Sequence, residues 1–145
     1  MGNALDVMDK ALSALNSGDL DGYINCYADD ATLWSPSRRA TVRGKGPIQE
    51  SAEGWFTAFP GLQFKRDEVI EAGDRIVLEC TFSGTQTGPW VRQSGTIPAT
   101  GRHVEVPYVG VFQVRDGKIV AERSYFDVLG IMTQLGLIPV ATSTT

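Results

Sequence analysis

The side chains best suited to acid–base chemistry lie in two extended segments toward the C-terminus, 102–115 and 118–126. In the favoured register of these segments, Glu122 and Tyr108 share a face with apolar residues. A carboxyl group on an apolar face needs a partner, a raised pKa or contact with water in a cavity, and each condition suits proton transfer. We therefore predict Glu122 as the proton carrier and Tyr108 as its hydrogen-bonding companion. The alternatives are a solvated Glu122 at the rim of a sheet and a Tyr108 that belongs to the core.

This assignment depends on the turn between the two segments, because a shift of one residue in register moves every side chain to the opposite face. A three-residue turn at 115–117, with Gly117 in the left-handed bulge position, is the favoured interpretation. It puts Gly110 across from Glu122, where a glycine would leave room for a ligand. A two-residue turn would put Arg123 on the inner face instead. The favoured turn predicts an inner face made of Val104, Val106, Tyr108, Gly110, Phe112, Val114, Val120, Glu122, Ser124 and Phe126.

The predicted substrate-binding residues surround this carboxyl group. Ser124 lies across from Tyr108 in the same register, and it has no histidine partner on its strand that would make it a nucleophile. Alternate residues of the segment 75–85 are expected to face inward, and a tryptophan such as Trp34 can line an apolar pocket. The predicted set comprises Ser124, Gly110, Phe112, Phe126, Cys80, Phe82 and Trp34.

Other polar side chains receive structural or surface interpretations. Asp127 precedes an apolar helical segment and is interpreted as its N-cap, worth about 1 kcal/mol, with a catalytic role as the alternative. His103 alternates with outward residues, and the loop 37–39 is too short for a polyanion site and is interpreted as solvated. Because the chain has one histidine and two cysteines, Cys26 and Cys80, without CxxC spacing, we predict neither a metal site nor a cofactor.

Helices precede the strands that would hold these residues. Apolar residues recur at three- and four-residue steps over 4–16, Asp19 can cap a short second helix whose apolar face includes Tyr23 and Tyr27, and Pro47 begins a third helix. Helices followed by strands indicate an α+β fold, with one curved antiparallel sheet wrapped around the N-terminal helices. Extended segments are predicted at 62–71, 75–85, 102–115 and 118–126, with a long loop between the second and the third and a closing helix at 127–135.

Length and charge limit the classes of function. At 145 residues, of which 42% are hydrophobic and 21% charged, the chain is predicted to form one domain over 1–139, followed by a frayed tail at 140–145. A net charge of −4 offers no attraction for nucleic acid or for an anionic membrane. No apolar run is long enough to cross a bilayer and no leader pattern is visible, so we expect a cytoplasmic protein.

Short phrases in the C-terminal third carry a family resemblance. They are Gly110-Val111-Phe112-Gln113-Val114, Asp116-Gly117-Lys118-Ile119-Val120, Tyr125-Phe126-Asp127 and Gln134-Leu135-Gly136. In this order they are similar to the SnoaL-like polyketide cyclase family, a branch of the conical nuclear-transport-factor-like fold, and 110–127 also resembles limonene epoxide hydrolase. The resemblance implies a cone-shaped domain that holds a hydrophobic small molecule in an internal apolar pocket. It also implies a homodimer through the outer sheet face, where an apolar patch is predicted at Val109, Val111, Ala121 and Tyr125.

The family's catalytic residues do not transfer to this sequence. The acid of the cyclases lies three residues before the aspartate of the Tyr-Phe-Asp phrase, where this chain has Ser124, and a cavity histidine falls on Gly110. The Arg and Asp of the epoxide hydrolases fall on Cys80 and Phe82. We therefore expect another carboxyl group to support a cofactor-free cyclisation or isomerisation of a hydrophobic polyketide-like or terpenoid metabolite. The alternatives are a non-catalytic binding or accessory protein of the same fold and, remotely, an epoxide hydrolase.

Overall fold

The computed structural model describes residues 3–38, 40–92 and 94–138, so the tail predicted at 140–145 lies outside the described residues. Helices begin the chain and strands make up most of the remainder, which is the order predicted for an α+β fold. The helices are α1 (Asn3–Ser17), α2 (Leu20–Ile24), α3 (Lys45–Ala58) and α4 (Val128–Gln134). The strands are β1 (Tyr27–Trp34), β2 (Val42–Arg43), β3 (Gln63–Ala72), β4 (Arg75–Thr85), β5 (Trp90–Arg92), β6 (Gly95–Ile97), β7 (His103–Arg115) and β8 (Lys118–Phe126).

Local sequence signals account for the ends of several helices. Gly18, just beyond α1, adopts a φ of 73°, which favours glycine after a helix. The Asp19 side chain accepts a hydrogen bond of 2.9 Å from the Gly22 backbone N–H and caps α2. Asp127 accepts a hydrogen bond of 2.8 Å from the Gly130 backbone N–H at the start of α4, so its predicted role as an N-cap is confirmed. None of the helices in the described part of the chain is long and apolar enough to span a bilayer.

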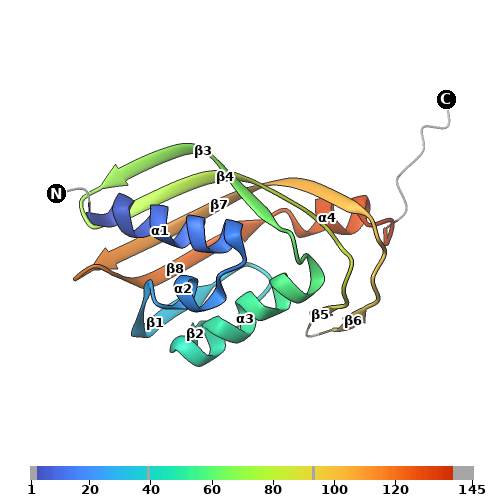
Figure 1. Ribbon diagram of the computed structural model, residues 1–145, viewed down its shortest axis with the longest axis horizontal. Helices are drawn as coiled ribbons and strands as arrows, with labels where there is room; N and C mark the ends of the chain where they lie inside the picture. Colours follow the sequence, from blue (N-terminus) through green and yellow to red (C-terminus); the bar gives the residue numbers. More distant parts are fainter. Residues whose placement is uncertain (1–2, 39, 93, 139–145) are drawn as a thin grey trace.

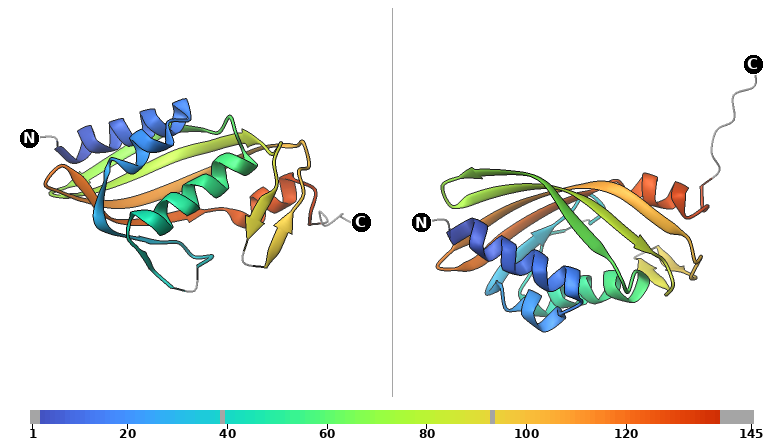
Figure 2. Two further views of the ribbon diagram at one scale, coloured as in Figure 1. Left: turned by 60° about the horizontal axis from the view of Figure 1, so that its bottom comes forward. Right: turned by 45° about the horizontal axis from the view of Figure 1, so that its top comes forward.

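Six strands form one curved sheet in the order β2-β1-β8-β7-β4-β3. Neighbouring strands are antiparallel except for β1 and β8, which run parallel. Figures 1 and 2 show the sheet curving over α1, α2 and α3, with α4 beyond one end of these three helices. The fold is therefore the predicted curved sheet wrapped around N-terminal helices, and the sheet remains open because β2 and β3 are its edges.

A small hairpin of β5 and β6 forms an arm where the sequence predicts a long loop. The arm packs against α3 through β5 (Figure 2). At its base, the fully buried Gln86 side chain donates to the backbone oxygens of Gly88, Ile97 and Pro98 and accepts from the Thr100 N–H and hydroxyl. A single glutamine between glycines and threonines produces no periodic pattern, so the sequence did not indicate the arm.

The turn between β7 and β8 differs from the prediction. Asp116 and Gly117 form a two-residue turn with positive φ values of 53° and 74°, and Arg115 pairs directly with Lys118. Two consecutive left-handed residues match the right-handed twist of the strands, and an Asp-Gly pair favours this geometry over the three-residue turn. Taken alone, this turn would place Arg123 on the inner face.

A β-bulge in β8 compensates for the shorter turn. Ile119 and Ala121 pair with adjacent residues of β7, so Val120 between them is an extra residue without a partner. Because of this extra residue, the side chains after Val120 point to the opposite faces from those that the two-residue turn alone would give. Glu122 is therefore buried and Arg123 is exposed. The inner-face residue near the turn is therefore the fully buried Ile119 and not Val120, as the favoured turn had predicted.

Candidate functional site

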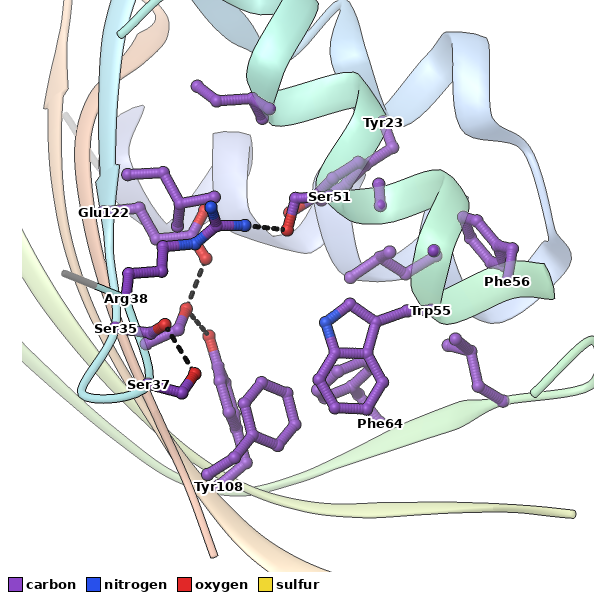
Figure 3. Close-up of a pocket in the computed structure, with 18 of the residues that line it drawn as sticks. Tyr23, Ser35, Ser37, Arg38, Ser51, Trp55, Phe56, Phe64, Tyr108 and Glu122 are labelled. Atoms are coloured by element: carbon purple, nitrogen blue, oxygen red, sulfur yellow. Dashed lines mark hydrogen bonds between the residues drawn. The ribbon is translucent and has the colours of Figure 1, made fainter. Parts of the chain in front are cut away.

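A cavity of about 740 Å³ lies between the concave side of the sheet and the helices. Its volume is within the range of small-molecule sites. All four helices contribute lining residues, as do the loop after β1, the β5–β6 arm and the strands β1, β3, β4, β7 and β8. In the close-up of Figure 3, polar side chains gather around Glu122 and aromatic rings gather around Trp55.

Five side chains form one hydrogen-bonded chain at the cavity, and all of them except the fully buried Tyr27 line it. Glu122, which is only 7% exposed, accepts hydrogen bonds from the Tyr27 hydroxyl at Oε1 and from the Ser124 hydroxyl at Oε2. The hydroxyls of Tyr23 and Tyr27 lie 2.5 Å apart. The Tyr108 hydroxyl lies 2.9 Å from Ser124 Oγ. Figure 3 marks this hydrogen bond of Tyr108 with a dashed line. The chain thus joins α2, β1, β8 and β7 around one carboxyl group.

Each hydroxyl carries one proton, and this settles the direction of every bond in the chain when Glu122 is ionised. Tyr27 and Ser124 donate their protons to the carboxylate. Tyr23 must therefore donate to Tyr27, and Tyr108 must donate to Ser124. When Glu122 is protonated, the hydrogen bonds on one side of it, toward either Tyr23 or Tyr108, reverse their direction. The tyrosine hydroxyl at that end then turns its proton toward the cavity, which both Tyr23 and Tyr108 line.

Burial determines the acidity of these groups. It raises the pKa of Glu122 above the usual range of a carboxyl group. Hydrogen bonds from Ser124 and Tyr27 act on this pKa in the opposite direction, as does the charge of Arg38. The pKa values of the three tyrosines are raised well above that of a free phenol, first by burial and second by the charge of Glu122. As the pH rises, Glu122 is therefore the first group of the chain to lose a proton.

Aromatic rings form another wall of the cavity. Trp55 of α3 stacks on Phe126 with ring centroids 4.7 Å apart and an interplanar angle of 21°. Its ring lies 5.3 Å from that of Trp90 in the arm. Phe64 has its centroid 5.2 Å from that of Tyr108, so the aromatic wall continues directly into the hydrogen-bonded chain. A flat apolar molecule can stack on such a surface.

The structure brings five of the predicted site residues together at the cavity. Glu122, Tyr108, Ser124, Phe112 and Phe126 all line it. Their pairing differs from the prediction because the shorter turn and the bulge in β8 each shift the register by one residue. Tyr108 lies across from Phe126 and not from Ser124, and Phe112 lies across from Glu122. Tyr108 still reaches Ser124 because its hydroxyl extends along the sheet.

Gly110 does not provide the space for a ligand that the sequence suggested. It lies across from Ser124 and is not among the residues that line the cavity. A Cβ atom at this position would collide with the Phe112 ring and the Tyr108 hydroxyl. The missing side chain therefore makes room for two neighbouring residues of the protein itself.

Three other residues of the predicted set lie outside the cavity lining. Trp34 pairs with Arg123 across β1 and β8, and its ring meets that of Tyr125 at 5.7 Å, so it belongs to the outer side of the sheet. Cys80 is buried as a core residue. Phe82 is fully buried behind the aromatic wall, with its ring edge-on to Trp55 at 5.5 Å. The alternation along β4 placed Cys80 and Phe82 on the correct face of the sheet. It does not show which of the inward-facing residues are covered by other side chains.

The sequence missed two polar residues of the site. Tyr27 was assigned to the second helix with Tyr23, whereas it begins β1 and is fully buried against Glu122. Arg38 was assigned to a solvated loop, whereas it lines the cavity and donates a hydrogen bond of 2.8 Å to Ser51. The aromatic and acidic composition around Tyr27 was visible, but no local pattern connects residues 95 positions apart. Arg39, beside Arg38, lies outside the described residues.

Other potentially reactive groups lie away from this site. Cys26 and Cys80 are free and buried. His103 is exposed at the start of β7, and its Nδ1 lies 3.0 Å from the Thr85 hydroxyl. Among residues 3–38, 40–92 and 94–138, no group of three or more His, Cys, Asp or Glu side chains is placed to hold a metal ion.

Comparison with known proteins identifies the family. Residues 5–135 match the family model of the SnoaL-like polyketide cyclases. The chain belongs to the SnoaL-like polyketide cyclase family. The SnoaL-like resemblance of the C-terminal phrases is thus confirmed over nearly the whole chain. A comparison with curated proteins finds no match.

Solved structures share this SnoaL-like architecture. TsrD from Streptomyces laurentii has 28% identity and a TM-score of 0.79, covering 94% of this chain and 97% of TsrD. IdmH from Streptomyces antibioticus, a proposed polyketide cyclase, has 26% identity and a TM-score of 0.76, covering 92% of this chain and 98% of IdmH. An epoxide hydrolase from M. tuberculosis, described as LEH-like, has 22% identity and a TM-score of 0.69, covering 92% of this chain and 89% of its own, and indicates a shared fold alone.

Proposed function

We propose that this SnoaL-like protein catalyses a cofactor-free cyclisation or isomerisation of a hydrophobic polyketide-like or terpenoid metabolite, with Glu122 as the proton carrier and Tyr108 as a hydrogen-bond donor. The observation that carries the proposal is the buried Glu122 carboxyl on the wall of an aromatic cavity. Burial raises its pKa toward the pH at which a single group can both accept and return a proton.

The position of Ser124 supports this assignment. The resemblance to the cyclases places their catalytic acid at Ser124, and Glu122 lies two residues earlier on the same inward face of β8. Ser124 donates a hydrogen bond to Glu122. The carboxyl group is therefore displaced by two residues along the strand, and the residue at the family position orients it.

The proposed cyclisation balances without an oxidant or a cofactor. Ionised Glu122 removes a proton from the carbon next to a substrate carbonyl, and the electron pair of the C–H bond forms an enolate. The enolate carbon then bonds to a second carbonyl carbon of the same molecule, and the proton on Glu122 passes to the alkoxide that results. Return of the proton to a different carbon, without the new bond, is the corresponding isomerisation.

The hydrogen-bonded chain supplies a donor at the moment when the enolate forms. Once Glu122 holds a proton, it can donate to Ser124, and Ser124 can then donate to Tyr108. The Tyr108 hydroxyl proton is released toward the cavity, where it can bind the enolate oxygen. Proton uptake and stabilisation of the negative charge are thereby coupled through three residues.

A test of this function uses 5-nitrobenzisoxazole, a flat aromatic compound that opens to a coloured phenolate when a base removes its C–H proton. We expect wild-type protein to accelerate this reaction, with a rate that rises with pH through an ionisation above about 4.3, the ordinary carboxyl value. Glu122→Gln should lower the rate by about 10² to 10⁴-fold with little change in binding, because it keeps the shape but removes the titrating group.

Glu50→Gln is the matched control, because Glu50 is an exposed carboxylate that also lines the cavity. Its rate should remain close to that of the wild type. An undiminished rate in Glu122→Gln would remove Glu122 from the mechanism. Binding of the probe without conversion by the wild type would favour a non-catalytic binding or accessory protein. Epoxide hydrolysis gains no support, because Cys80 and Phe82, at the positions of the hydrolase residues, do not line the cavity.

A further inference from the structure

The cavity has a polar side and an aromatic side. Figure 3 shows Arg38, Ser35, Ser37 and Glu122 together on one side, while Trp55 and its neighbouring rings lie across the space from them. A uniformly apolar ligand would leave the polar groups of the first side without partners. The division therefore indicates an occupant that is itself polar at one end.

Arg38 is the principal cation of the polar side. It follows β1 in the chain, reaches across to α3 and donates through Nη2 to Ser51 Oγ at 2.8 Å. Figure 3 shows its guanidinium between Ser51 and Glu122. A guanidinium has five N–H donors, and this hydrogen bond uses one of them while holding the group in place.

Arg92 of the β5–β6 arm adds a second cation to the lining. Its guanidinium carbon lies 4.6 Å from the centroid of the Trp90 ring, so the arm holds it against the aromatic wall. Arg92 is half-buried, and this burial lowers the pKa of its guanidinium. Among the described residues, no carboxylate forms an ion pair with Arg38 or Arg92.

We infer that the substrate is an amphipathic acid, in which a flat apolar ring system stacks beside Trp55 and a carboxylate binds Arg38, with Arg92 as a second cation. A planar guanidinium fork matches the two oxygens of a carboxylate, and charge-assisted bonds of this kind are the strong ones. The inference rests on the proposed function, because it takes the same cavity as the substrate site. It adds the charge of the substrate and the residue that recognises it.

Two carboxyl groups in the lining oppose an anionic ligand, and neither outweighs the arginines. Glu50 is exposed, so water screens its charge. Glu122 is buried and, when ionised, accepts hydrogen bonds from the Tyr27 and Ser124 hydroxyls that stabilise its negative charge. The N–H groups of Arg38 that do not bind Ser51 therefore remain the strongest available donors for an anion.

The test compares anthraquinone-2-carboxylate with its methyl ester, two flat molecules with the same ring system, of which only the acid is charged. Isothermal titration calorimetry at pH 7.5 should show that wild-type protein binds the acid about tenfold more tightly than the ester. Arg38→Gln, which keeps a polar amide but lacks the charge, should abolish this preference and leave the affinity for the ester within a factor of about three. Arg75→Met is the control, because Arg75 is an exposed arginine outside the cavity lining.

Equal or tighter binding of the ester by the wild type would overturn the inference, as would failure of both probes to bind. A preference that survives in Arg38→Gln would remove Arg38 as the anchor. If that variant does not fold, titrations of the wild type between 0.05 and 0.5 M salt provide the second test, since the affinity for the acid must fall while that for the ester stays constant. These outcomes concern binding alone, so they are distinguishable from a failure of Glu122→Gln to reduce turnover.

Discussion

Gln86 and Glu122 are both buried polar side chains with complete hydrogen bonding, but their surroundings differ in kind. Gln86 is bound by three backbone carbonyls and by the N–H and hydroxyl of Thr100. Glu122 is bound by two side-chain hydroxyls, each of which continues to a tyrosine. Gln86 joins the two ends of the β5–β6 arm outside the cavity lining, whereas Glu122 lies on the cavity wall.

The difference shows how the partners of a buried polar group indicate its role. The Gln86 amide and the backbone groups around it cannot exchange a proton at accessible pH, so the contacts of Gln86, including the one with the Thr100 hydroxyl, hold a shape. Hydroxyl groups can act as donor or acceptor, so the contacts of Glu122 permit a proton to move without leaving any group unsatisfied. The first arrangement is structural, and the second is suited to chemistry.

The largest expected effect is the loss of stability when Gln86, the structural residue of the two, is replaced. Gln86→Leu should lower the free energy of unfolding by about 3 kcal/mol, because several buried backbone groups lose their partner at once. Urea denaturation measures the change. Gln134→Leu is the control, since Gln134 also bonds two backbone groups, of Glu105, but is exposed, so water can replace it and the loss should stay under about 1 kcal/mol. Equal losses in the two variants would show that the burial of Gln86 has no special effect.

A smaller loss of stability is expected when one hydrogen bond to Glu122 is removed. Tyr27→Phe removes the hydroxyl that joins Tyr23 to Glu122 and should lower the free energy of unfolding by about 1.5 kcal/mol. Because the Tyr27 hydrogen bond lowers the pKa of Glu122, its loss should also move the rate profile with 5-nitrobenzisoxazole to higher pH. Tyr125→Phe, on the outer face, is the control and should change neither quantity. A destabilised Tyr27→Phe with an unmoved profile would reduce Tyr27 to a packing role.

The smallest expected effect is on the pH dependence of stability, because hydrogen bonds to Glu122 offset part of the effect of burial. The folded-state pKa of Glu122 lies above its unfolded value, so the folded state binds the proton more tightly. This contribution to stability is fully present below the unfolded pKa and is lost as the pH rises through the folded pKa. The stability of the wild type relative to Glu122→Gln should therefore fall with rising pH over that window. Denaturation curves that run parallel at every pH would contradict the assignment.

Part of the site could be predicted because it depends on alternation within single strands. Glu122, Ser124 and Phe126 share one face of β8, as their spacing indicates. The predicted inward facing of Glu122 was nevertheless correct, through two compensating differences, a shorter turn at Asp116-Gly117 and a bulge at Val120. Alternation cannot reveal a bulge, because the extra residue is defined by the pairing of the neighbouring strand.

The sequence by itself determined the features that arise from neighbouring residues: the helix caps at Asp19 and Asp127, the order of helices and strands, and the family to which the chain belongs. Only the tertiary structure decided which groups meet at the cavity. Tyr27 reaches Glu122, and Arg38 reaches Ser51, from separate elements of the fold. Caps and periodicity depend on bonds within one or two turns of chain, whereas a site depends on distances between segments, which packing alone establishes.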